Sequence, residues 1–105
     1  MAELLKELDA GLEAATAILN AGRTTQLVKL SATFGKVWTR ISCVDLNDDG
    51  TEREFGRYCW GFMDTDGKLW KSAGWKAPAK NKPRGVVADL HNATIVQGWR
   101  YGGIQ

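Results

Sequence analysis

The sequence predicts an α+β fold in which one N-terminal amphipathic helix packs on a twisted antiparallel β-meander of roughly 4–6 strands. Two observations lead to this prediction. Apolar residues recur at alternating spacings of three and four up to residue 20, and from residue 24 onward their spacing changes to two. With 105 residues and 44% hydrophobic content, the chain is expected to form a single domain over residues 1–105 with its own core.

The helix is expected over residues 2–21. Its apolar stripe contains Leu5, Leu8 and Leu12, and it continues to the end of the segment. Gly22 follows, and glycine commonly takes the left-handed conformation that ends a helix. Because such a stripe can also form a contact between two helices, the sequence leaves a monomer and a homodimer open.

The sheet is expected over residues 24–101. A Gly-Lys turn, an NDDG turn and a DTDG turn separate four strands, the last of which is KLWKS at 68–72. A basic loop with two prolines and two glycines follows over 73–85. The segments GVVADL and ATIVQGWRY are then expected to be short strands that complete the sheet, although the first also fits a helical turn.

Strand register decides which side chains enter the core. In the first hairpin, Phe34 is expected opposite Val37. This register directs the following residues toward the helix: Val28, Leu30, Ala32, Phe34, Val37, Ile41 and Cys43.

The second hairpin has two open registers. If Asp45 pairs with Arg57, Cys43 faces Cys59 and Trp70 lies in the core. In that case the opposite face of the sheet carries Lys29, Trp38, Arg40, Tyr58, Trp60, Phe62 and Lys71. If Leu46 meets Arg53 instead, every side chain of the third strand changes face, and Tyr58, Trp60 and Phe62 enter the core.

Residues with catalytic or metal-binding potential do not form a complete pattern. Asp45, Asn47 and Asp49 have the spacing of a calcium loop, but Gly56 occupies the position where that loop needs a glutamate, so a polar hairpin turn is favoured. The single histidine, His91, is far in sequence from both cysteines. We therefore expect no enzyme, no cofactor and no metal site, and a pair of buried thiols rather than a disulfide.

Charge is distributed unevenly along the chain. Residues 1–22 are mainly acidic, whereas residues 67–105 are mainly basic. The segment KLWKSAGWKAPAKNKPRG at 68–85 carries six basic side chains and two tryptophans without any carboxylate. Lysine and arginine neutralise phosphates, and aromatic rings stack on bases, so this composition favours nucleic acid bound with low sequence specificity, single strands included.

The candidate binding residues lie mainly in the loop. They are Trp75, Lys76, Lys80, Lys82 and Arg84, with Lys71, Trp38, Arg40 and Arg100 as additions. The same residues also fit two different roles. Their aromatic and basic surface suits an acidic host protein, since tryptophan, tyrosine and arginine carry much of the binding energy in protein interfaces. Alternatively, the tryptophans fix the loop to the sheet and the lysines are simply solvated.

The stretch GKLWKSAGWKAPAKNKPRGVVAD, together with the closing GWRYGG, is similar to the C-terminal part of small uncharacterised proteins of bacteriophages and other mobile elements. The resemblance covers the last part of the chain and implies no catalytic residues. It implies an accessory protein that binds host machinery, either to inhibit it or to adapt it. The chain also has no apolar run near the roughly 18 residues of a spanning helix and no targeting pattern, so a cytoplasmic protein without membrane contact is expected.

Overall fold

A computed structural model describes residues 2–105, without the side chains of Ala2, Phe55 and Tyr101. The chain begins with helix α1 (Ala2–Asn20). It continues through the strands β1 (Val28–Phe34), β2 (Thr39–Leu46), β3 (Glu52–Met63), β4 (Lys68–Trp70) and β5 (Gly85–Val86). The last elements are the 3-10 turn η1 (Val87–His91), helix α2 (Ala93–Trp99) and the 3-10 turn η2 (Arg100–Gly102).

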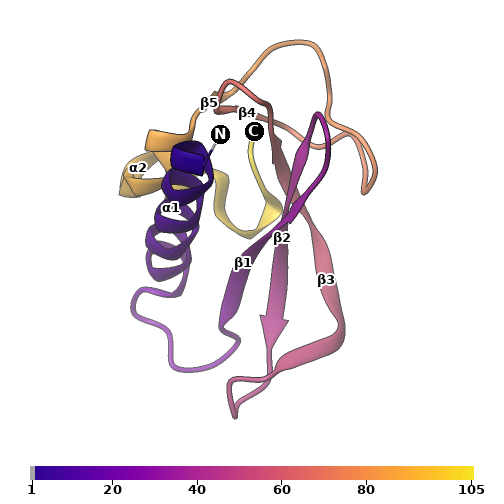
Figure 1. Cartoon of the computed structure of the whole chain (residues 1–105). Helices are drawn as coiled ribbons and strands as arrows, with labels where there is room; N and C mark the ends of the chain where they lie inside the picture. Colours follow the sequence, from indigo (N-terminus) through magenta and orange to yellow (C-terminus); the bar gives the residue numbers. More distant parts are fainter. Residues whose placement is uncertain (1) are drawn as a thin grey trace.

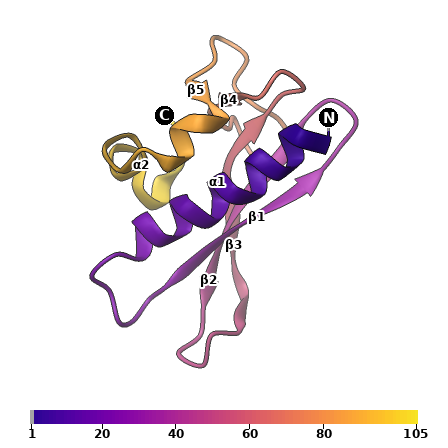
Figure 2. The ribbon, with the colours of Figure 1, turned by 60° about the vertical axis from the view of Figure 1, so that its left-hand side comes forward.

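The five strands form one sheet in the order β1-β2-β3-β4-β5, and each pairs antiparallel with its neighbour. Helix α1 crosses one face of this sheet, and η1 and α2 pack beside it (Figures 1 and 2). The predicted α+β fold, an N-terminal helix on an antiparallel meander, is therefore confirmed. We call the sheet face covered by these helices the core face and the other the outer face.

The C-terminal segment is mainly helical, so the strand predicted for ATIVQGWRY was wrong, whereas GVVADL contains both the short strand and the helical turn that the sequence left open. Only Gly85–Val86 pairs with β4, and the rest of GVVADL forms the helical turn η1. The side chain of Asn92 accepts a hydrogen bond from the Ile95 amide at 3.2 Å and so caps the start of α2. Val96 and Trp99 then share one buried face, because a spacing of about three to four residues follows the helical period.

The first hairpin has a longer turn than predicted. Phe34 pairs with Thr39 instead of Val37, which shifts the register by two residues. A shift of two keeps every side chain on its predicted face. Val28, Leu30, Ile41 and Cys43 are accordingly buried on the core face. The exceptions are Phe34 and Val37, which are 54% and 61% exposed, because the longer turn carries them to the tip of the hairpin.

The second hairpin follows the first predicted register only in part, and the alternative pairing of Leu46 with Arg53 does not form. Near Met63 the pairing is the first one, with Ile41 opposite Gly61. A bulge at Trp60 then shifts the register, and a second irregularity ends with Leu46 opposite Glu52. Trp60 is consequently buried in the core, and Tyr58 packs against the core from the same side. Phe62 alone of these three aromatic residues lies on the outer face, opposite Arg40.

The bulge also separates the two cysteines. Cys43 pairs with Tyr58, whereas Cys59 pairs with Ser42, so the Cys43–Cys59 pairing that the first register implied does not form. Both residues are free thiols. Because Cys43 and Ser42 are consecutive strand residues, the two cysteines point to opposite faces of the sheet.

Trp70 lies on the outer face, which corrects its predicted place in the core. Leu69 is the fully buried residue of β4, and Trp70 pairs with Phe62. Trp38 contacts both rings edge-on, with centroid distances of 6.3 Å to Phe62 and 5.6 Å to Trp70. The indole nitrogen of Trp70 donates a hydrogen bond to Asp64 Oδ2 at 2.9 Å. These aromatic residues therefore form a small second cluster behind the sheet.

The C-terminal residues complete the main core. Trp60 meets Trp99 edge-on at a centroid distance of 5.7 Å, and its indole nitrogen donates to the Arg100 carbonyl at 2.9 Å. Ile104 is buried, and its amide donates to the Trp60 carbonyl at 2.8 Å. Among the described residues, neither helix combines the length and the apolar character that crossing a bilayer demands.

Candidate functional site

The basic loop after β4 is a hairpin fixed at both ends. Ser72 and Pro78 form an isolated antiparallel bridge, and the Ala79 amide donates to the Lys71 carbonyl at 2.7 Å. The chain returns to the sheet through the Arg84 amide, which donates to the Leu69 carbonyl at 2.7 Å. We call residues 71–84 the basic hairpin. Its backbone forms a hydrogen-bonded hairpin instead of the free loop that the sequence suggested over 73–85.

Trp75 lies at the tip of the basic hairpin and is held by Arg40 of β2. The Arg40 Nε donates to the Trp75 carbonyl at 2.7 Å, and the Arg40 guanidinium carbon lies 4.4 Å from the centre of the indole ring. This distance is within the range of a cation–π contact. Trp75 is nevertheless 42% exposed. The hairpin therefore presents an oriented indole with a large part of its surface in solvent.

The basic hairpin that carries this indole also carries four lysines. Lys71, Lys76, Lys80 and Lys82 are all exposed, and within residues 2–105 none of them forms an ion pair with a carboxylate. Unpaired lysines on flexible stems can contact phosphates without first breaking a salt bridge. The structure thus brings four of the predicted basic residues together with Trp75.

Arg84 and Trp38 have structural roles in the same region. The Arg84 guanidinium donates to the Gln105 carbonyl at 3.3 Å and to Asn81 Oδ1 at 3.4 Å, so it fastens the end of the hairpin to the C-terminus. Trp38 is partly buried against Phe62 and Trp70. Of the predicted aromatic pair, only Trp75 has a ring at the surface of the hairpin.

Arg100 lies away from the basic hairpin. It belongs to η2, and it lines a shallow hollow with Arg23, Gln97 and Ile18 near the C-terminal end of α1. This position is on the core-face side of the sheet, whereas Arg40 and Trp75 are on the outer-face side. Arg100 therefore does not extend the surface formed by the lysines.

The two thiols are poorly suited to nucleophilic chemistry. Burial raises the pKa of Cys43 to about 11, partly offset by a hydrogen bond with Tyr58. Burial likewise raises the pKa of Cys59, and a backbone hydrogen bond of Gly61 only partly opposes this effect. Since the thiolate is the nucleophile, both groups are protonated and unreactive near neutral pH.

The NDDG segment forms the polar hairpin turn that was predicted between β2 and β3. Asp49 Oδ1 accepts hydrogen bonds from the Thr51 amide at 3.0 Å and from the Thr51 hydroxyl at 2.6 Å. These bonds lower the pKa of Asp49. Residues 2–105 contain no group of three or more histidine, cysteine, aspartate or glutamate side chains placed to hold a metal ion.

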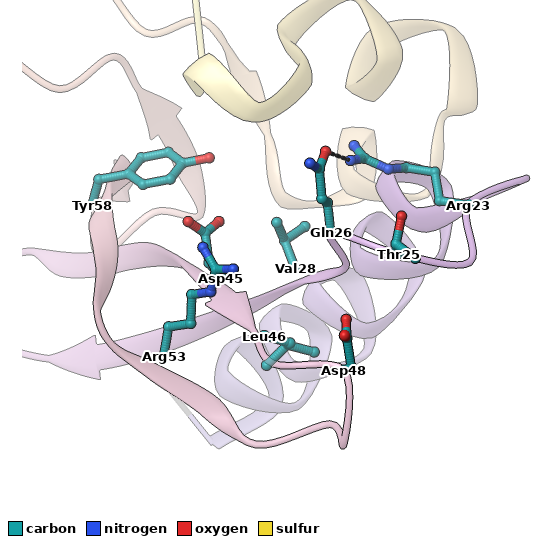
Figure 3. A pocket seen from close by; sticks show the side chains of 9 residues that line it. All are labelled: Arg23, Thr25, Gln26, Val28, Asp45, Leu46, Asp48, Arg53 and Tyr58. Atoms are coloured by element: carbon teal, nitrogen blue, oxygen red, sulfur yellow. Dashed lines mark hydrogen bonds between the residues drawn. The ribbon is translucent and has the colours of Figure 1, made fainter.

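One pocket was not predicted from the sequence. It has a volume of about 490 Å³ and lies between the segment after α1, the end of β2 and the bulged part of β3 (Figure 3). Its lining residues are Arg23, Thr25, Gln26, Val28, Asp45, Leu46, Asp48, Arg53 and Tyr58. Gln26, whose side chain accepts a hydrogen bond from Arg23 at 3.1 Å, has a left-handed backbone with φ of 56°. The walls carry two arginines and two aspartates, so neither sign of charge is favoured. No sequence pattern indicates this pocket, because distant segments form it through a strand irregularity.

Comparison of the chain with protein-family models, curated proteins and solved structures found no match. The molecular surface is therefore the guide to function. The feature with the clearest chemical character is the basic hairpin, because it combines exposed charge of one sign with an exposed aromatic ring.

Proposed function

We propose that this protein is a non-enzymatic module that binds nucleic acid with low sequence specificity through the basic hairpin and Arg40. The observation that carries the proposal is an exposed indole, held by a guanidinium, among lysines that have no carboxylate partner. A base stacked on such a ring contributes about 1–3 kcal/mol, and the lysines add an electrostatic attraction for phosphates.

The chemistry of the hairpin supports single strands as the preferred form. An aromatic ring at a hairpin tip can stack only on a base that is itself unstacked, as bases in single strands are. Base-specific readout uses planar side chains such as arginine or asparagine aimed at base edges. In the hairpin, Arg84 and Asn81 bond to each other and Arg40 lies against Trp75, so these groups are already occupied. This arrangement favours low specificity.

Two further observations support this role. The raised pKa of Cys43 and of Cys59 disfavours a nucleophilic thiol, which is consistent with a binding module rather than an enzyme. Both cysteines are free thiols, and free thiols suit a reducing compartment such as the cytoplasm. We therefore place the site of action in the cytoplasm.

The salt dependence of binding tests the proposal. The affinity for a fluorescein-labelled oligo(dT) is measured by anisotropy at increasing salt, and the logarithm of the association constant is expected to fall with a slope of about −3 if four lysines each contact a phosphate. The triple variant K76A/K80A/K82A should lower the magnitude of this slope by about 2, since each contact to a single strand contributes about 0.7. An affinity that is unchanged between low and moderate salt would contradict the proposal.

A matched control has the same loss of charge at other positions. The variant K6A/K29A/K36A removes three lysines from α1, β1 and the first hairpin turn, none of which belongs to the basic hairpin. It should keep nearly the full slope, apart from a small effect of net charge. If both triple variants lose the same affinity, the attraction depends on overall charge and not on this surface.

A second candidate function uses the same surface for a protein partner. The Arg40–Trp75 pair favours it, because tryptophan and arginine are the residues that most often dominate protein interfaces. In this alternative the protein is an accessory factor, of the kind that the phage resemblance implies, which inhibits or adapts a host protein with an acidic surface.

Trp75→Ala distinguishes the two functions. For nucleic acid, it should weaken oligo(dT) binding by about 1–3 kcal/mol while the triple lysine variant lowers the salt slope. For a protein partner, Trp75→Ala should abolish binding and the triple lysine variant should largely retain it. Thermal unfolding supplies the control, because a ring that is 42% exposed should affect the melting temperature little. A large drop in melting temperature with unchanged binding would assign Trp75 a structural role only.

A further inference from the structure

The outer edge of β1 is partly closed by α1. β1 is the first strand of the sheet, so only one of its edges pairs with another strand. The Asn20 side chain accepts a hydrogen bond from the Val28 amide at 2.9 Å and donates one to the Val28 carbonyl at 2.8 Å. The Thr16 hydroxyl accepts a hydrogen bond from the Leu30 amide at 3.1 Å. Side chains of α1 thereby bond both backbone groups of Val28 and the amide of Leu30, and covering a sheet edge in this way commonly prevents unwanted pairing.

The second half of the same edge remains open. In an antiparallel pair, alternate residues direct both the amide and the carbonyl away from the neighbouring strand. The backbone groups of Val28 and Leu30 point away from β2. Those of Ala32 are therefore the next ones along the strand that do so. The side-chain hydrogen bonds from α1 to β1 end at Leu30. The amide and carbonyl of Ala32 therefore form an unfilled pairing position, in register with two positions that already have partners.

A hollow runs beside this open position. It has a volume of about 370 Å³, and its lining residues are Asp9, Leu12, Glu13 and Thr16 from α1 with Lys29, Leu30, Ser31 and Ala32 from β1. The helix side carries two carboxylates. Farther along the strand, a smaller hollow of about 110 Å³ is lined by Leu5, Phe34 and Val37, among others. The edge thus combines free backbone groups with a helix wall that carries two carboxylates, a strand wall that carries Lys29, and an apolar end.

We propose that an extended basic peptide segment of a partner protein adds to the sheet along this edge of β1. Its backbone pairs with Ala32, one of its lysine or arginine side chains lies beside Asp9 and Glu13, and an apolar side chain contacts Phe34. Backbone pairing supplies affinity in this mode of recognition, and alternate side chains supply specificity. This surface is separate from the basic hairpin, so the inference does not depend on the nucleic-acid proposal.

Charge argues against a second copy of this chain as the occupant. Each copy carries α1 along its own β1 edge. Antiparallel pairing of two β1 strands would therefore bring the Asp9 and Glu13 carboxylates of both copies toward one another. A basic peptide places the opposite charge at the same position, which is why it is the favoured occupant.

The test uses a fluorescein-labelled heptapeptide in which lysine alternates with valine, with binding measured by anisotropy. Ala32→Pro removes the outward amide, and a proline is tolerated there because that amide is not part of the ladder with β2. We expect this variant to bind the peptide about tenfold more weakly, the effect of losing one backbone hydrogen bond of about 1.4 kcal/mol. The wild-type protein should bind a peptide with glutamate in place of lysine more weakly than it binds the lysine peptide.

The charge contribution is tested with a matched pair of variants. D9N/E13Q removes both carboxylates from the hollow and should reduce both the affinity for the lysine peptide and its salt dependence. E3Q/E7Q removes two carboxylates from the same helix, and neither residue lines the hollow, so binding should be unchanged. The triple variant K76A/K80A/K82A should also bind the peptide normally, which separates this result from the nucleic-acid experiment.

Three outcomes would overturn the proposal. The first is equal binding of the lysine and glutamate peptides, and the second is wild-type binding by a folded Ala32→Pro protein. The third is a dimer in analytical ultracentrifugation that Ala32→Pro dissociates, without any peptide binding, which would assign the edge to a second copy. If Ala32→Pro fails to fold, a peptide with N-methylated backbone amides provides the same test on the wild-type protein, and equal binding of that peptide would reject strand addition.

Discussion

The thiol of Cys43 shows how one buried residue couples the fold to pH. It lies on the core face of β2 and has no measurable exposure. Burial disfavours its charged form most strongly, the hydrogen bond with Tyr58 opposes that effect, and the charge of Asp45 adds to it. Its pKa is consequently about 11 instead of 9.0. The native state therefore holds this proton more tightly than the unfolded chain does.

The stability of the protein at alkaline pH is expected to depend on Cys43. Because the pKa is raised in the folded state, the contribution of Cys43 is fully present below pH 9 and is lost as the pH rises toward 11. Two pKa units correspond to a loss of about 3 kcal/mol. Urea unfolding followed between these pH values should show a smaller loss for Cys43→Ala than for the wild type. Parallel losses in both proteins would show that another group is responsible.

Single residues also determine which tryptophans can act at the surface. Trp60 and Trp75 are the same type of residue, yet Trp60 is buried and Trp75 is 42% exposed. The sequence correctly indicated a loop position for Trp75, because Gly74 precedes it and two prolines follow it within ten residues. It did not indicate Arg40 as the partner, since the two residues are far apart in the chain and meet only through the folded hairpin.

At the scale of elements, β3 was the hardest part to predict. One register of the second hairpin placed Tyr58, Trp60 and Phe62 in the core, whereas the other placed them on the opposite face and put Trp70 in the core. Hydrophobic pattern alone did not select one of the two. The structure keeps the first register from Met63 to Gly61, and the bulge at Trp60 then shifts the pairing by one residue, which turns Tyr58 and Trp60 to the core face. Gly61 is a local signal for this arrangement, because a side chain there would collide with Ile104.

The C-terminal segment was mispredicted for a different reason. Helix α2 is only seven residues long, and Thr94, Ile95 and Val96 are β-branched residues that favour strands in isolation. The signal for a helix is Asn92, a good N-cap residue directly before it. Tertiary contacts with α1 and η1 then outweigh the weak local preference.

Two glycines of this C-terminal region are expected to respond oppositely to alanine. Gly103 has a φ of 105°, and a Cβ there would lie 2.5 Å from the Trp60 carbonyl oxygen. Gly103→Ala should therefore destabilise the protein by about 1–3 kcal/mol or more. Gly98 lies in α2 with open space around it, so Gly98→Ala should stabilise by about 0.5–1 kcal/mol.

Urea denaturation of the two glycine variants provides the measurement, with the wild type as reference. The prediction depends on Ile104 being held against Trp60 by its amide hydrogen bond. If Gly103→Ala has wild-type stability, that contact does not contribute to the folded state. If Gly98→Ala is also destabilising, α2 requires a glycine at this position for a reason other than space.

At the scale of the whole molecule, the uneven charge of the chain becomes an uneven surface. The acidic residues Asp9 and Glu13 border the hollow beside β1, whereas Lys76, Lys80 and Lys82 project from the basic hairpin beyond β4. The basic hairpin contacts the outer-face side of the sheet through Arg40 of β2, whereas α1 packs on the core face. If the proposed nucleic-acid binding holds, we expect this distribution of charge to orient a polyanion toward the basic hairpin before contact.

The packing between the helices and the sheet also predicts how the whole chain unfolds. Leu90 of η1 is fully buried and lies against α1, where a Cβ at Gly11 would approach Leu90 Cδ1 to 2.9 Å. Trp60 and Trp99 join the sheet to α2 in the same core. Because one core connects the first and last elements, we expect a single cooperative transition in which tryptophan fluorescence and far-UV circular dichroism change together.

Leu90→Ala should move both curves to lower urea by the same amount, equivalent to about 2–5 kcal/mol. Two separated transitions, or a shift seen by only one of the two signals, would show that the helices and the sheet unfold as independent parts.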